Sequence, residues 1–429
     1  MNVYDSEVVA SILSGNGYTP CTSLEEARVI LVNTCSIRDN AEQRVWGRLD
    51  VFRQYKKKNP AVRVAVLGCM ASRLKDKLVE HPAVDFVVGP DSYRLLPMLL
   101  EGSASPEAPS AHPLAPIQTK LSKTETYADV SPLRMDKNGV TTFVSIMRGC
   151  NNMCAYCIVP YVRGAERSRD PFTIEKEVRD LFAQGYKEVN LLGQNVDSYL
   201  WNEETFAHLM ERIALISPSL RVRFATSHPK DINDSLLHVM ARYPNICQHI
   251  HLPVQSGSNA MLERMNRKYT RETYLARVAK IREILPNCVI STDMIAGFCG
   301  ETLEDHAQTL RLMQEVRFDQ AFLFQYSERP NTFAARHLAD DVPEAEKTRR
   351  LNELIALQNQ LSLQSNQAAV GKEFDVLVEG ASKRNAEEYF GRTSGNKVCV
   401  FPRKDVQIGD YVRVRVTSCS AATLKAEII

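Results

Sequence analysis

The sequence lacks several features that would assign the chain to a simple class of protein. It contains no apolar run long enough to cross a bilayer and no secretory leader, so we expect the cytoplasm as its compartment. The 53 basic and 51 acidic side chains nearly cancel and leave a formal net charge of +2. A chain with so little net charge is not a polycation, and any binding of nucleic acid must come from local basic patches.

A fourth cysteine is missing from the most informative motif. The segment RGCNNMCAYCIVP spaces Cys150, Cys154 and Cys157 as C-x3-C-x2-C, and no further cysteine follows closely. Structural zinc sites and ordinary four-iron clusters use four protein ligands. Three thiolates that hold three irons leave the fourth iron open to a non-protein ligand, as in a catalytic metal site. A zinc site completed by a distant histidine is the alternative; the spacing, the position after a strand and the neighbouring Tyr156 favour iron.

The other cysteines do not suit a disulfide framework, because the total of 11 is odd and cytosolic thiols stay reduced. Several lie in or beside apolar, strand-like runs, where a free thiol packs as a small hydrophobic group. We expect a structural role for Cys247, Cys288, Cys399 and Cys419.

Apolar, β-branched runs alternate with helical segments along most of the 429 residues, which predicts an α/β protein with about two to four domains. In the N-terminal part, parallel strands are expected at 27–35, 62–69 and 84–90, with helices at 4–18 and 39–60. This part opens on a helix, whereas a βαβ domain normally starts with a strand.

Six strand-like runs in the central part indicate an open, partial β/α barrel, in which chemistry lies in the loops after the strands. Helices are expected between them, for example at 173–185 and 271–286. The three-cysteine segment follows the first run. The predicted strands are 141–147, 188–193, 221–226, 249–254, 289–297 and 320–327.

These patterns divide the chain into five parts. The first is a Rossmann-like domain, and a linker rich in Ser, Ala and Pro separates it from the partial barrel. A polar connecting helix leads to a small β-barrel of four short strands, predicted at 373–380, 388–394, 397–402 and 410–418. The boundaries are 1–100, 101–138, 139–345, 346–370 and 371–429.

The three-cysteine motif resembles that of the radical S-adenosylmethionine enzymes, which carry an aromatic residue before the last cysteine. Further segments resemble the methylthiotransferases of that superfamily: NTCSIRDNAEQRV, GCMASRLKDKL, VPYVRGAERSR, LLGQNVDSY, TSHPKDI, HLPVQSGSNAMLERMNRKYTRE and STDMIAGFCGET. NTCSIR resembles the tRNA-modifying, MiaB-type branch, and the C-terminal strands resemble a TRAM domain, an RNA-binding module.

The resemblance implies an enzyme that adds a methylthio group to carbon 2 of N6-isopentenyladenosine beside the anticodon of tRNA. S-adenosylmethionine would serve as radical source and as methyl donor, and Cys150, Cys154 and Cys157 would hold the radical cluster. The expected partners are tRNA and an electron donor such as a flavodoxin or ferredoxin, and we expect a monomer. Action on threonylcarbamoyladenosine or on a ribosomal-protein aspartate stays open, as does a redox-sensing, RNA-binding iron–sulfur protein.

The same resemblance implies a second, auxiliary four-iron cluster that delivers sulfur. Relatives hold it with three cysteines of the N-terminal domain, of which Cys35 and Cys69 match here. Both follow predicted strands, at the edge where open α/β sheets bind ligands; buried structural thiols are the alternative. The third cysteine would lie two residues before Met1, so we expect the sequence to begin inside this domain, and Cys21 is not assigned as a ligand.

Residues beside the expected clusters are candidates for binding the cofactor. Tyr156 precedes the last cysteine, and the segment from Gly193 through Gln194 to Asn195 matches the place where radical enzymes bind the methionine amino group. Later strand ends carry Gln255, Asp293 and Glu301, for which a loop-capping role is equally open.

Basic residues are candidates for binding the substrate. Arg163, Arg167 and Arg169 form a cluster that suits a carboxylate or phosphate, with ordinary surface charge as the alternative. In the last domain, basic and aromatic residues alternate as in RNA-binding grooves, although Glu387 and Glu388 dilute the patch. We assign Lys383, Arg384, Arg392 and Phe401 to substrate binding; Lys397, Arg403, Lys404, Tyr389 and Phe390 lie in the same pattern.

Overall fold

The computed structural model describes residues 1–36, 39–102, 115–135 and 139–429. The chain forms two compact units. The first consists of Met1–Met135, Met147–Met153 and Cys157–Arg169, and the second of Asp136–Ile146, Cys154–Tyr156 and Asp170–Ile429. None of the helices in the described parts of the chain is long and apolar enough to span a membrane.

The first unit is built on a parallel four-stranded sheet with helices on both faces. Alternate residues of its second strand point to opposite faces, so Ala65 and Leu67 enter one hydrophobic core while Val64 and Val66 enter the other. This explains the almost continuous apolar run, and the three predicted strands are confirmed. In sheet order the strands are β1 (Val29–Thr34), β2 (Arg63–Gly68), β3 (Phe86–Val88) and β4 (Ile117–Gln118).

Helices of the first unit follow its strands in the expected alternation. The two predicted N-terminal helices are confirmed as α1 and α2, and α1 is followed by Gly15 as its C-cap. The helices are α1 (Asn2–Ser14), α2 (Asp39–Lys58), α3 (Cys69–Leu74), α4 (Asp76–Val79), α5 (Leu96–Glu101) and α6 (Val159–Arg163), with a 3-10 turn at Tyr93–Leu95. A hairpin of β6 (Met147–Arg148) and β7 (Arg167–Ser168) completes this unit.

Residues 115–135 belong to the segment that the sequence predicts as a linker, but they pack on the first unit. β4 pairs with β3, and the ring of Tyr127 is fully buried. The Tyr127 hydroxyl donates to the carbonyl of Pro90 at 3.0 Å and accepts from the amide of Tyr93 at 3.1 Å. A two-residue strand and one buried tyrosine carry no periodic signal, so composition alone suggested a linker. Residues 103–114 of that segment lie outside the described residues.

The second unit contains the six predicted parallel strands, which confirms the partial barrel. They form two three-stranded sheets, β11–β8–β5 and β12–β13–β14, and a bridge between Val222 and Ile246 lies between them. The strands are β5 (Thr141–Ser145), β8 (Glu188–Leu192), β11 (Arg221–Phe224), β12 (His249–His251), β13 (Val289–Ala296) and β14 (Gln320–Gln325).

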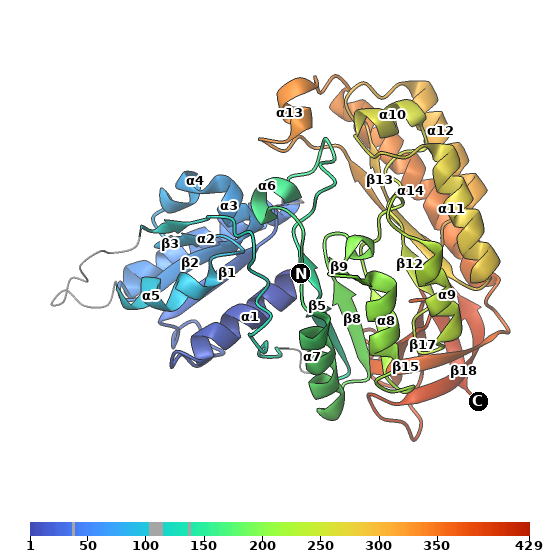
Figure 1. Ribbon diagram of the computed structural model, residues 1–429, viewed down its shortest axis with the longest axis horizontal. Helices are drawn as coiled ribbons and strands as arrows, with labels where there is room; N and C mark the ends of the chain where they lie inside the picture. Colours follow the sequence, from blue (N-terminus) through green and yellow to red (C-terminus); the bar gives the residue numbers. More distant parts are fainter. Residues whose placement is uncertain (37–38, 103–114, 136–138) are drawn as a thin grey trace. The chain divides into compact units, whose positions relative to one another are not determined.

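Helices cover the outside of these strands, and α7, α8, α9 and α11 succeed one another as neighbours (Figure 1). Side-chain caps set their starts: Asp170 accepts from the amide of Phe172 at 2.8 Å, so α7 begins before the predicted residue. The helices are α7 (Pro171–Ala183), α8 (Phe206–Ala214), α9 (Asp234–Arg242), α10 (Asn259–Arg264), α11 (Arg271–Ile284), α12 (Leu303–Val316) and α13 (Phe333–His337). A 3-10 turn at Val196–Ser198 and a small hairpin of β9 (Leu200–Trp201) and β10 (Glu204–Thr205) lie between β8 and α8.

The predicted connecting helix is α14 (Glu344–Gln367), and it is more than a connection. Its Gln358 side chain donates to the carbonyl of Phe318 at 2.9 Å, and the Ser362 hydroxyl donates to that of Asp319 at 2.8 Å. Leu354 is fully buried. The helix therefore packs along the last strands of the partial barrel, although its sequence is too polar to show an apolar face.

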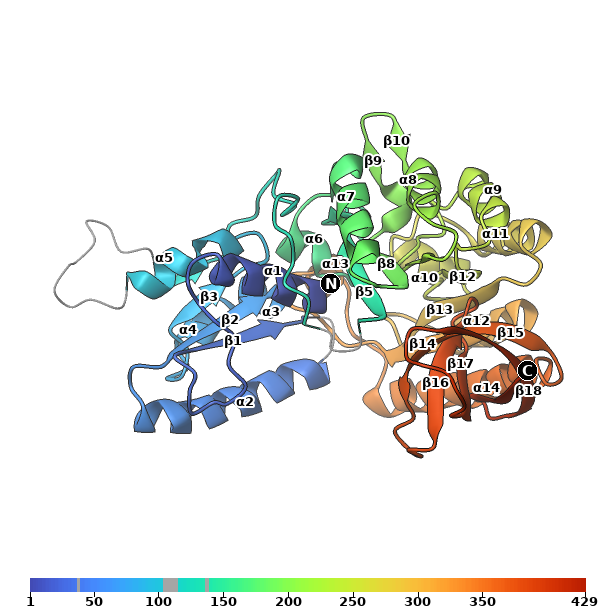
Figure 2. The same cartoon turned by 90° about the horizontal axis from the view of Figure 1, so that it is seen from below.

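The C-terminal part is a closed five-stranded barrel, drawn in orange and red in Figure 2. Its centre contains buried aliphatic side chains and Phe401. The four predicted strands are confirmed, and the structure adds a fifth at the end of the chain, LKAEI. In barrel order the strands are β15 (Glu373–Ala381), β16 (Glu388–Thr393), β17 (Val398–Pro402), β19 (Leu424–Ile428) and β18 (Tyr411–Cys419).

Candidate active site

The three-cysteine segment leaves strand β6 through a glycine. Gly149 has a φ of 80°, and a Cβ there would lie 2.0 Å from the carbonyl oxygen of Ala165, so no other residue fits. The amide of Cys150 donates to the carbonyl of Gly164 at 3.1 Å. These contacts fix the backbone on which Cys150 stands, and the thiols of Cys150 and Cys157 are both half-buried.

Cys154 belongs to the second unit, where its sulfur has a charged partner. The Nη1 atom of Arg267 donates to Sγ of Cys154 at 3.2 Å and lies 3.4 Å from the hydroxyl of Tyr156. The next residue, Ala155, is tied down on both sides, to the carbonyl of Met265 and the amide of Ala334. Burial alone would lower the pKa of Arg267, but the adjacent phenol and thiol groups outweigh it and raise that pKa. The guanidinium is therefore a fixed positive charge beside the thiol.

Cys35 and Cys69 lie at one edge of the first sheet, as expected. Thr34 and Gly68 are paired in the parallel register of β1 and β2, and each cysteine directly follows its member of that pair. Gly68 has a φ of 90°, and a Cβ there would lie 2.6 Å from the Thr34 carbonyl oxygen. The glycine therefore allows close approach of the two strand ends that carry the thiols.

Arg163 contacts one of these thiols. Its Nε atom donates to Sγ of Cys69 at 3.2 Å, and its Nη2 atom donates to Asp5 at 2.7 Å. Asp5 also pairs with Arg148 at 2.9 Å. Burial raises the pKa of the Cys69 thiol even though Arg163 opposes the shift. Burial would also raise the pKa of Asp5, but Arg148 and Arg163 together lower it to about 2.

The arginine cluster predicted to bind substrate is buried rather than exposed. Arg163 is 3% exposed and bound to Asp5 and Cys69, and Arg167 forms a two-bond ion pair with Asp91 at 3.0 and 3.1 Å. Arg169 donates to the Tyr4 hydroxyl at 3.2 Å. Each of the three guanidinium groups thus has an internal partner, although Nη1 of Arg163 has none among the described residues, and we do not retain them as substrate ligands. Spacing alone could not show this, because the acidic partners lie more than 70 residues away in sequence.

The residues after β8 present acceptors toward the inside of the second unit. Gly193 is buried, and the side-chain oxygens of Gln194 and Asn195 are buried without a hydrogen-bond partner in the described chain. The Asn195 amide nitrogen is held by Asp231 at 2.7 Å. Two unused acceptors at a strand end suit a ligand that carries N–H donors, such as an amino group.

Gln255, in the segment after β12, lies beside Asp293 of β13. The amide of Gln255, whose φ is 73°, donates to the carbonyl of Asp293 at 2.9 Å. The Asp293 carboxylate lies 3.3 Å from Nε2 of His251, whose Nδ1 is 2.9 Å from the hydroxyl of Ser291. Ser291 is buried and holds the ring of His251, while His251 and Asp293 are half-buried and offer polar atoms to a ligand.

Of the two roles left open for Glu301, the structure supports capping of a loop. Its carboxylate accepts from the amide of Gly297 at 2.7 Å and from Arg350 at 2.8 Å. The side chain is therefore used to close the loop after β13.

The C-terminal barrel separates its candidate RNA ligands into two groups. Phe401 is fully buried in the barrel core, which corrects its assignment as an exposed platform for a base. Lys383 and Arg384 are both exposed in the loop after β15, and Arg392 is half-buried beside Glu379 at 3.1 Å. Arg403 stacks on the ring of Tyr389 at 4.5 Å. Alternation along a strand does not reveal which face of a closed barrel a residue occupies, and this explains the error at Phe401.

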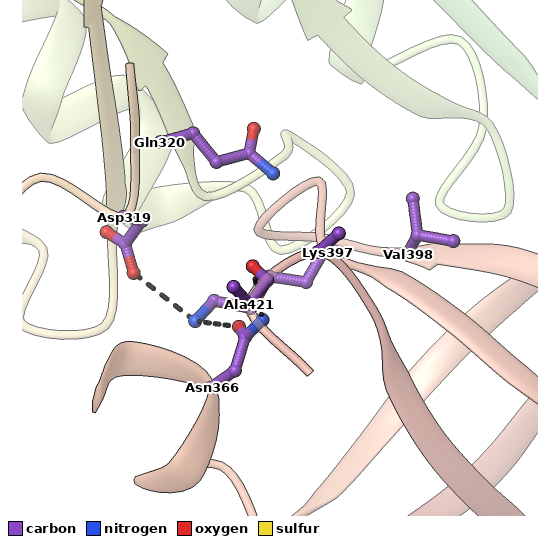
Figure 3. A pocket seen from close by; sticks show the side chains of 7 residues that line it. Asp319, Gln320, Asn366, Lys397, Val398 and Ala421 are labelled. Atoms are coloured by element: carbon purple, nitrogen blue, oxygen red, sulfur yellow. Dashed lines mark hydrogen bonds and ion pairs between the residues drawn. The ribbon is translucent and has the colours of Figure 1, made fainter. Parts of the chain in front are cut away.

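Lys397 is engaged within the second unit (Figure 3). Its ammonium group donates to Ser365 at 2.6 Å and to Asn366 at 3.1 Å, and it lies 3.3 Å from Asp319. These contacts join the C-terminal barrel to the end of α14 and to the residue before β14.

The turn between β16 and β17 lies against the amino ends of the partial-barrel strands. Arg223 pairs with Glu188 and donates to the carbonyls of Thr393 and Ser394 at 3.3 and 3.2 Å. A cavity of about 250 Å³ borders this turn, and its lining includes Asn190, His249 and Asn396. Burial lowers the pKa of His249 to about 3, so this ring is neutral at physiological pH.

Sequence reasoning missed the residues that act through long-range pairing. Arg267, Asp5, Arg148 and Arg223 each gain their role from partners far away in the chain. For Arg148 and Arg223 the local signal is a position in or beside an apolar segment, where an unpaired charge would be costly, whereas Arg267 lies in the polar segment ERMNRKYTR and carries no such signal.

Of the cysteines expected to be structural, Cys247 and Cys399 are buried, and Cys288 and Cys419 are half-buried. Burial raises the pKa of the Cys247 thiol to about 11 and that of Cys399 to about 12, so both stay protonated.

Three known families match parts of the chain. The Radical SAM superfamily matches residues 144–313, the uncharacterized protein family UPF0004 matches residues 1–89, and the TRAM domain matches residues 367–429.

Curated relatives match along the whole chain. The tRNA-2-methylthio-N(6)-dimethylallyladenosine synthase of Phocaeicola vulgatus is 57% identical over 432 residues, which cover 100% of this chain and 93% of the relative. The synthase of the same name from Bacteroides fragilis is 55% identical with the same coverage. That of Porphyromonas gingivalis is 52% identical over 436 residues, again covering 100% of this chain and 93% of the relative.

Solved structures share the fold at low identity. The radical S-adenosylmethionine methyltransferase TsrM from Kitasatospora setae matches 77% of this chain and 74% of its own, with a TM-score of 0.60 and 14% identity. The cobalamin-dependent radical enzyme OxsB matches 83% of this chain and 53% of its own, with a TM-score of 0.55 and 14% identity.

Proposed function

Because this chain belongs to the family of tRNA-2-methylthio-N(6)-dimethylallyladenosine synthases, which are radical S-adenosylmethionine enzymes, we propose that it methylthiolates carbon 2 of N6-isopentenyladenosine next to the anticodon of tRNA. The observation that carries this proposal is identity above 50% to synthases of this name along the entire chain. An aromatic C–H bond is inert to acid–base chemistry at neutral pH, so this reaction needs the radical route of the family.

The donor atoms suit iron–sulfur clusters. Cys150, Cys154 and Cys157 would hold one cluster, and Cys35 and Cys69 would contribute to a second. The described side chains do not converge into a set of three that would hold a single metal ion. A four-iron cluster is larger than one ion, so its thiolates lie further apart. A buried, unpartnered Nη1 atom of Arg163 beside Cys69 also suits a sulfide acceptor.

When bound, the clusters and S-adenosylmethionine would supply the radical that activates carbon 2 and the methylthio group. The chain's own residues would bind these groups and the nucleoside and would orient them. The free acceptors of Gln194 and Asn195 would receive the amino group of the methionine moiety, and the row of Asp293, His251 and Ser291 would meet polar atoms of the cofactor or nucleoside.

The C-terminal barrel would bind the RNA through its exposed basic residues. Lys383 and Arg384 are the strongest candidates, because both stand in a surface loop, while Arg392 is half-buried beside Glu379. We further propose a flavodoxin or ferredoxin as electron donor and a monomer as working form. We also propose a cytoplasmic location, which agrees with a tRNA substrate.

Nucleoside mass spectrometry tests the proposal. In a strain that lacks the gene, we expect the 2-methylthio nucleoside to vanish and N6-isopentenyladenosine to accumulate. The wild-type chain should restore the product, and a chain with Cys150→Ala, Cys154→Ala and Cys157→Ala should not. The purified triple variant should also lose about one four-iron cluster's worth of iron and sulfide and should not cleave S-adenosylmethionine.

Persistence of the methylthio nucleoside in the deletion strain would refute the assigned substrate. Loss of the threonylcarbamoyl derivative instead would assign the chain to the neighbouring branch of the family. Cleavage of S-adenosylmethionine by the triple variant would refute the cysteine assignment.

A further inference from the structure

A buried arginine donates to a cysteine sulfur in each of the two units. In the first unit, Nε of Arg163 lies 3.2 Å from Sγ of Cys69. In the second unit, Nη1 of Arg267 lies 3.2 Å from Sγ of Cys154. The two arginines are 3% and 4% exposed. A guanidinium stays charged at every physiological pH, and a neutral thiol is a weak acceptor for so costly a buried charge.

Other atoms of each guanidinium hold it in place. The Nη2 atom of Arg163 donates to Asp5 at 2.7 Å. Arg267 donates from Nη2 to the carbonyl of Pro253 at 2.8 Å and from Nε to the hydroxyl of Tyr269 at 2.9 Å. Because the guanidinium is planar and rigid, these bonds also fix the direction of the atom that meets the sulfur.

Both arginines lie where positive charge exceeds the negative charge of their partners. Arg148 and Arg163 share the single carboxylate of Asp5, while the next carboxylate, Asp91, forms its closest ion pair with Arg167. Three arginines against two aspartates leave one positive charge. The oxygen partners of Arg267 at Pro253 and Tyr269 are neutral. A buried charge requires a counter-charge, and a thiolate bound to a cluster would supply it in each place.

We propose that Arg163 and Arg267 are positioning residues, each of which raises the reduction potential of the iron–sulfur cluster held by the cysteine that it contacts. This inference rests on the proposed function, which assigns Cys154 to the three-cysteine cluster and Cys69 to the second cluster. A reduced cluster is more negative than an oxidised one, so a fixed positive donor stabilises the reduced state more. Hydrogen bonds to the sulfurs and local charge are among the factors that set cluster potentials.

Redox titration of the full-length, reconstituted chain tests the inference, with dithionite as reductant and electron paramagnetic resonance as readout. With Arg267→Met, we expect the ratio of reduced to oxidised three-cysteine cluster at a fixed potential to fall at least tenfold, which is 59 mV for one electron. Arg163→Met should shift the second cluster in the same direction and leave the first unchanged. Lysine at either position keeps the charge without the rigid fork, so we expect an intermediate shift.

Two arginines that form ion pairs with buried glutamates, and that take no part in the charge balance around Arg163 or Arg267, serve as matched controls: Arg134→Met in the first unit and Arg223→Met in the second. Both break buried ion pairs and should lower stability while leaving both potentials unchanged. Equal shifts in the controls would overturn the inference, because the effect would then follow from loss of stability. Unchanged potentials in the methionine variants would overturn it as well.

Two further outcomes are decisive. If the methionine and lysine variants at one position both fail to retain the cluster while the controls retain it, the residue serves assembly and not potential. A wild-type chain that binds only one cluster refutes the inference for Arg163. The proposed function fails separately, through nucleoside analysis, in a chain that holds its clusters and makes no methylthio nucleoside.

Discussion

The buried carboxylate of Asp5 shows how single residues organise the first unit. It is fully buried and accepts from Arg148 and Arg163 at 2.9 and 2.7 Å. One of these arginines reaches the carbonyl of Pro90 and the other reaches Cys69. A single carboxylate thereby links helix α1 to the hairpin and helix that flank the three-cysteine segment.

This arrangement predicts a dependence of stability on pH. The pKa of Asp5 is lowered from 3.8 to about 2 in the folded chain, because Arg148 and Arg163 outweigh the effect of burial. The carboxylate therefore stabilises the fold fully above pH 3.8, and this contribution is lost as the pH falls toward 2. Its size is on the order of 2 kcal/mol.

Urea unfolding of the wild-type chain and of Asp5→Asn between pH 6 and pH 2, expressed as free energy of unfolding, measures this contribution. The variant should be less stable at about pH 6, and the difference should shrink in acid. A difference that stays constant with pH would show that the ionised form of Asp5 is not what stabilises the fold.

Among the elements, the loop between β15 and β16 offers the clearest surface for RNA. Lys383 and Arg384 stand in this loop, while the arginines of β18 are already paired: Arg415 contacts Glu373 at 2.8 Å and Arg413 contacts Asp375 at 3.0 Å. An arginine that already has a carboxylate partner gains less from a phosphate, because it must exchange one anion for another.

Replacing both loop residues, Lys383→Ser and Arg384→Ser, should weaken tRNA binding and make it less sensitive to salt. Each lost phosphate contact should reduce the slope of log Kd against log salt by roughly 1. Filter binding at several salt concentrations measures both quantities. The matched control replaces Arg413 and Arg415 by serine, and an equal effect of the two double variants would contradict the assignment of the loop.

Across the second unit, a buried ion pair joins the C-terminal barrel to the partial barrel. Arg223 and Glu188 form two hydrogen bonds at 3.2 and 3.1 Å, and the same guanidinium donates to the carbonyls of Thr393 and Ser394. The hydroxyl of Tyr411 adds bonds to the carbonyls of Lys187 and Ser219. The RNA-binding module is thus docked at the amino ends of the strands, opposite the edge that bears the candidate cofactor ligands.

Arg223→Ala should therefore destabilise the second unit by about 3–5 kcal/mol, because it leaves Glu188 buried and unpaired. The rate of amide hydrogen exchange in residues 388–402 should rise as the free energy of unfolding falls. Arg212→Ala is the control: this arginine also pairs with two glutamates but is partly exposed, and its loss should cost about 1 kcal/mol or less.

Replacing Arg223 and Glu188 together by Met and Leu should lower the free energy of unfolding by less than Arg223→Met alone. An equal or larger loss would show that the unpaired carboxylate is not the cause.

Patterns that repeat along the chain determined most of the architecture in advance. The alternation of β-branched runs with helices predicts the succession of strands along the chain in both α/β parts, because each strand is a short, local run. The spacing of Cys150, Cys154 and Cys157 is likewise a local property. Both can be read from the sequence since they need no knowledge of distant partners.

Tertiary structure alone decided which polar residues are available for chemistry. Arg163, Arg167 and Arg169 look alike in sequence as a surface cluster, yet each is buried against a partner from a distant segment. Phe401 lies on the inner face of a barrel whose closure depends on an unpredicted last strand. Arg267 has its proposed role because it contacts Cys154, 113 residues earlier in the chain. The physical reason is that charge pairing and burial depend on distances through space, whereas periodicity and spacing record only the neighbours along the chain.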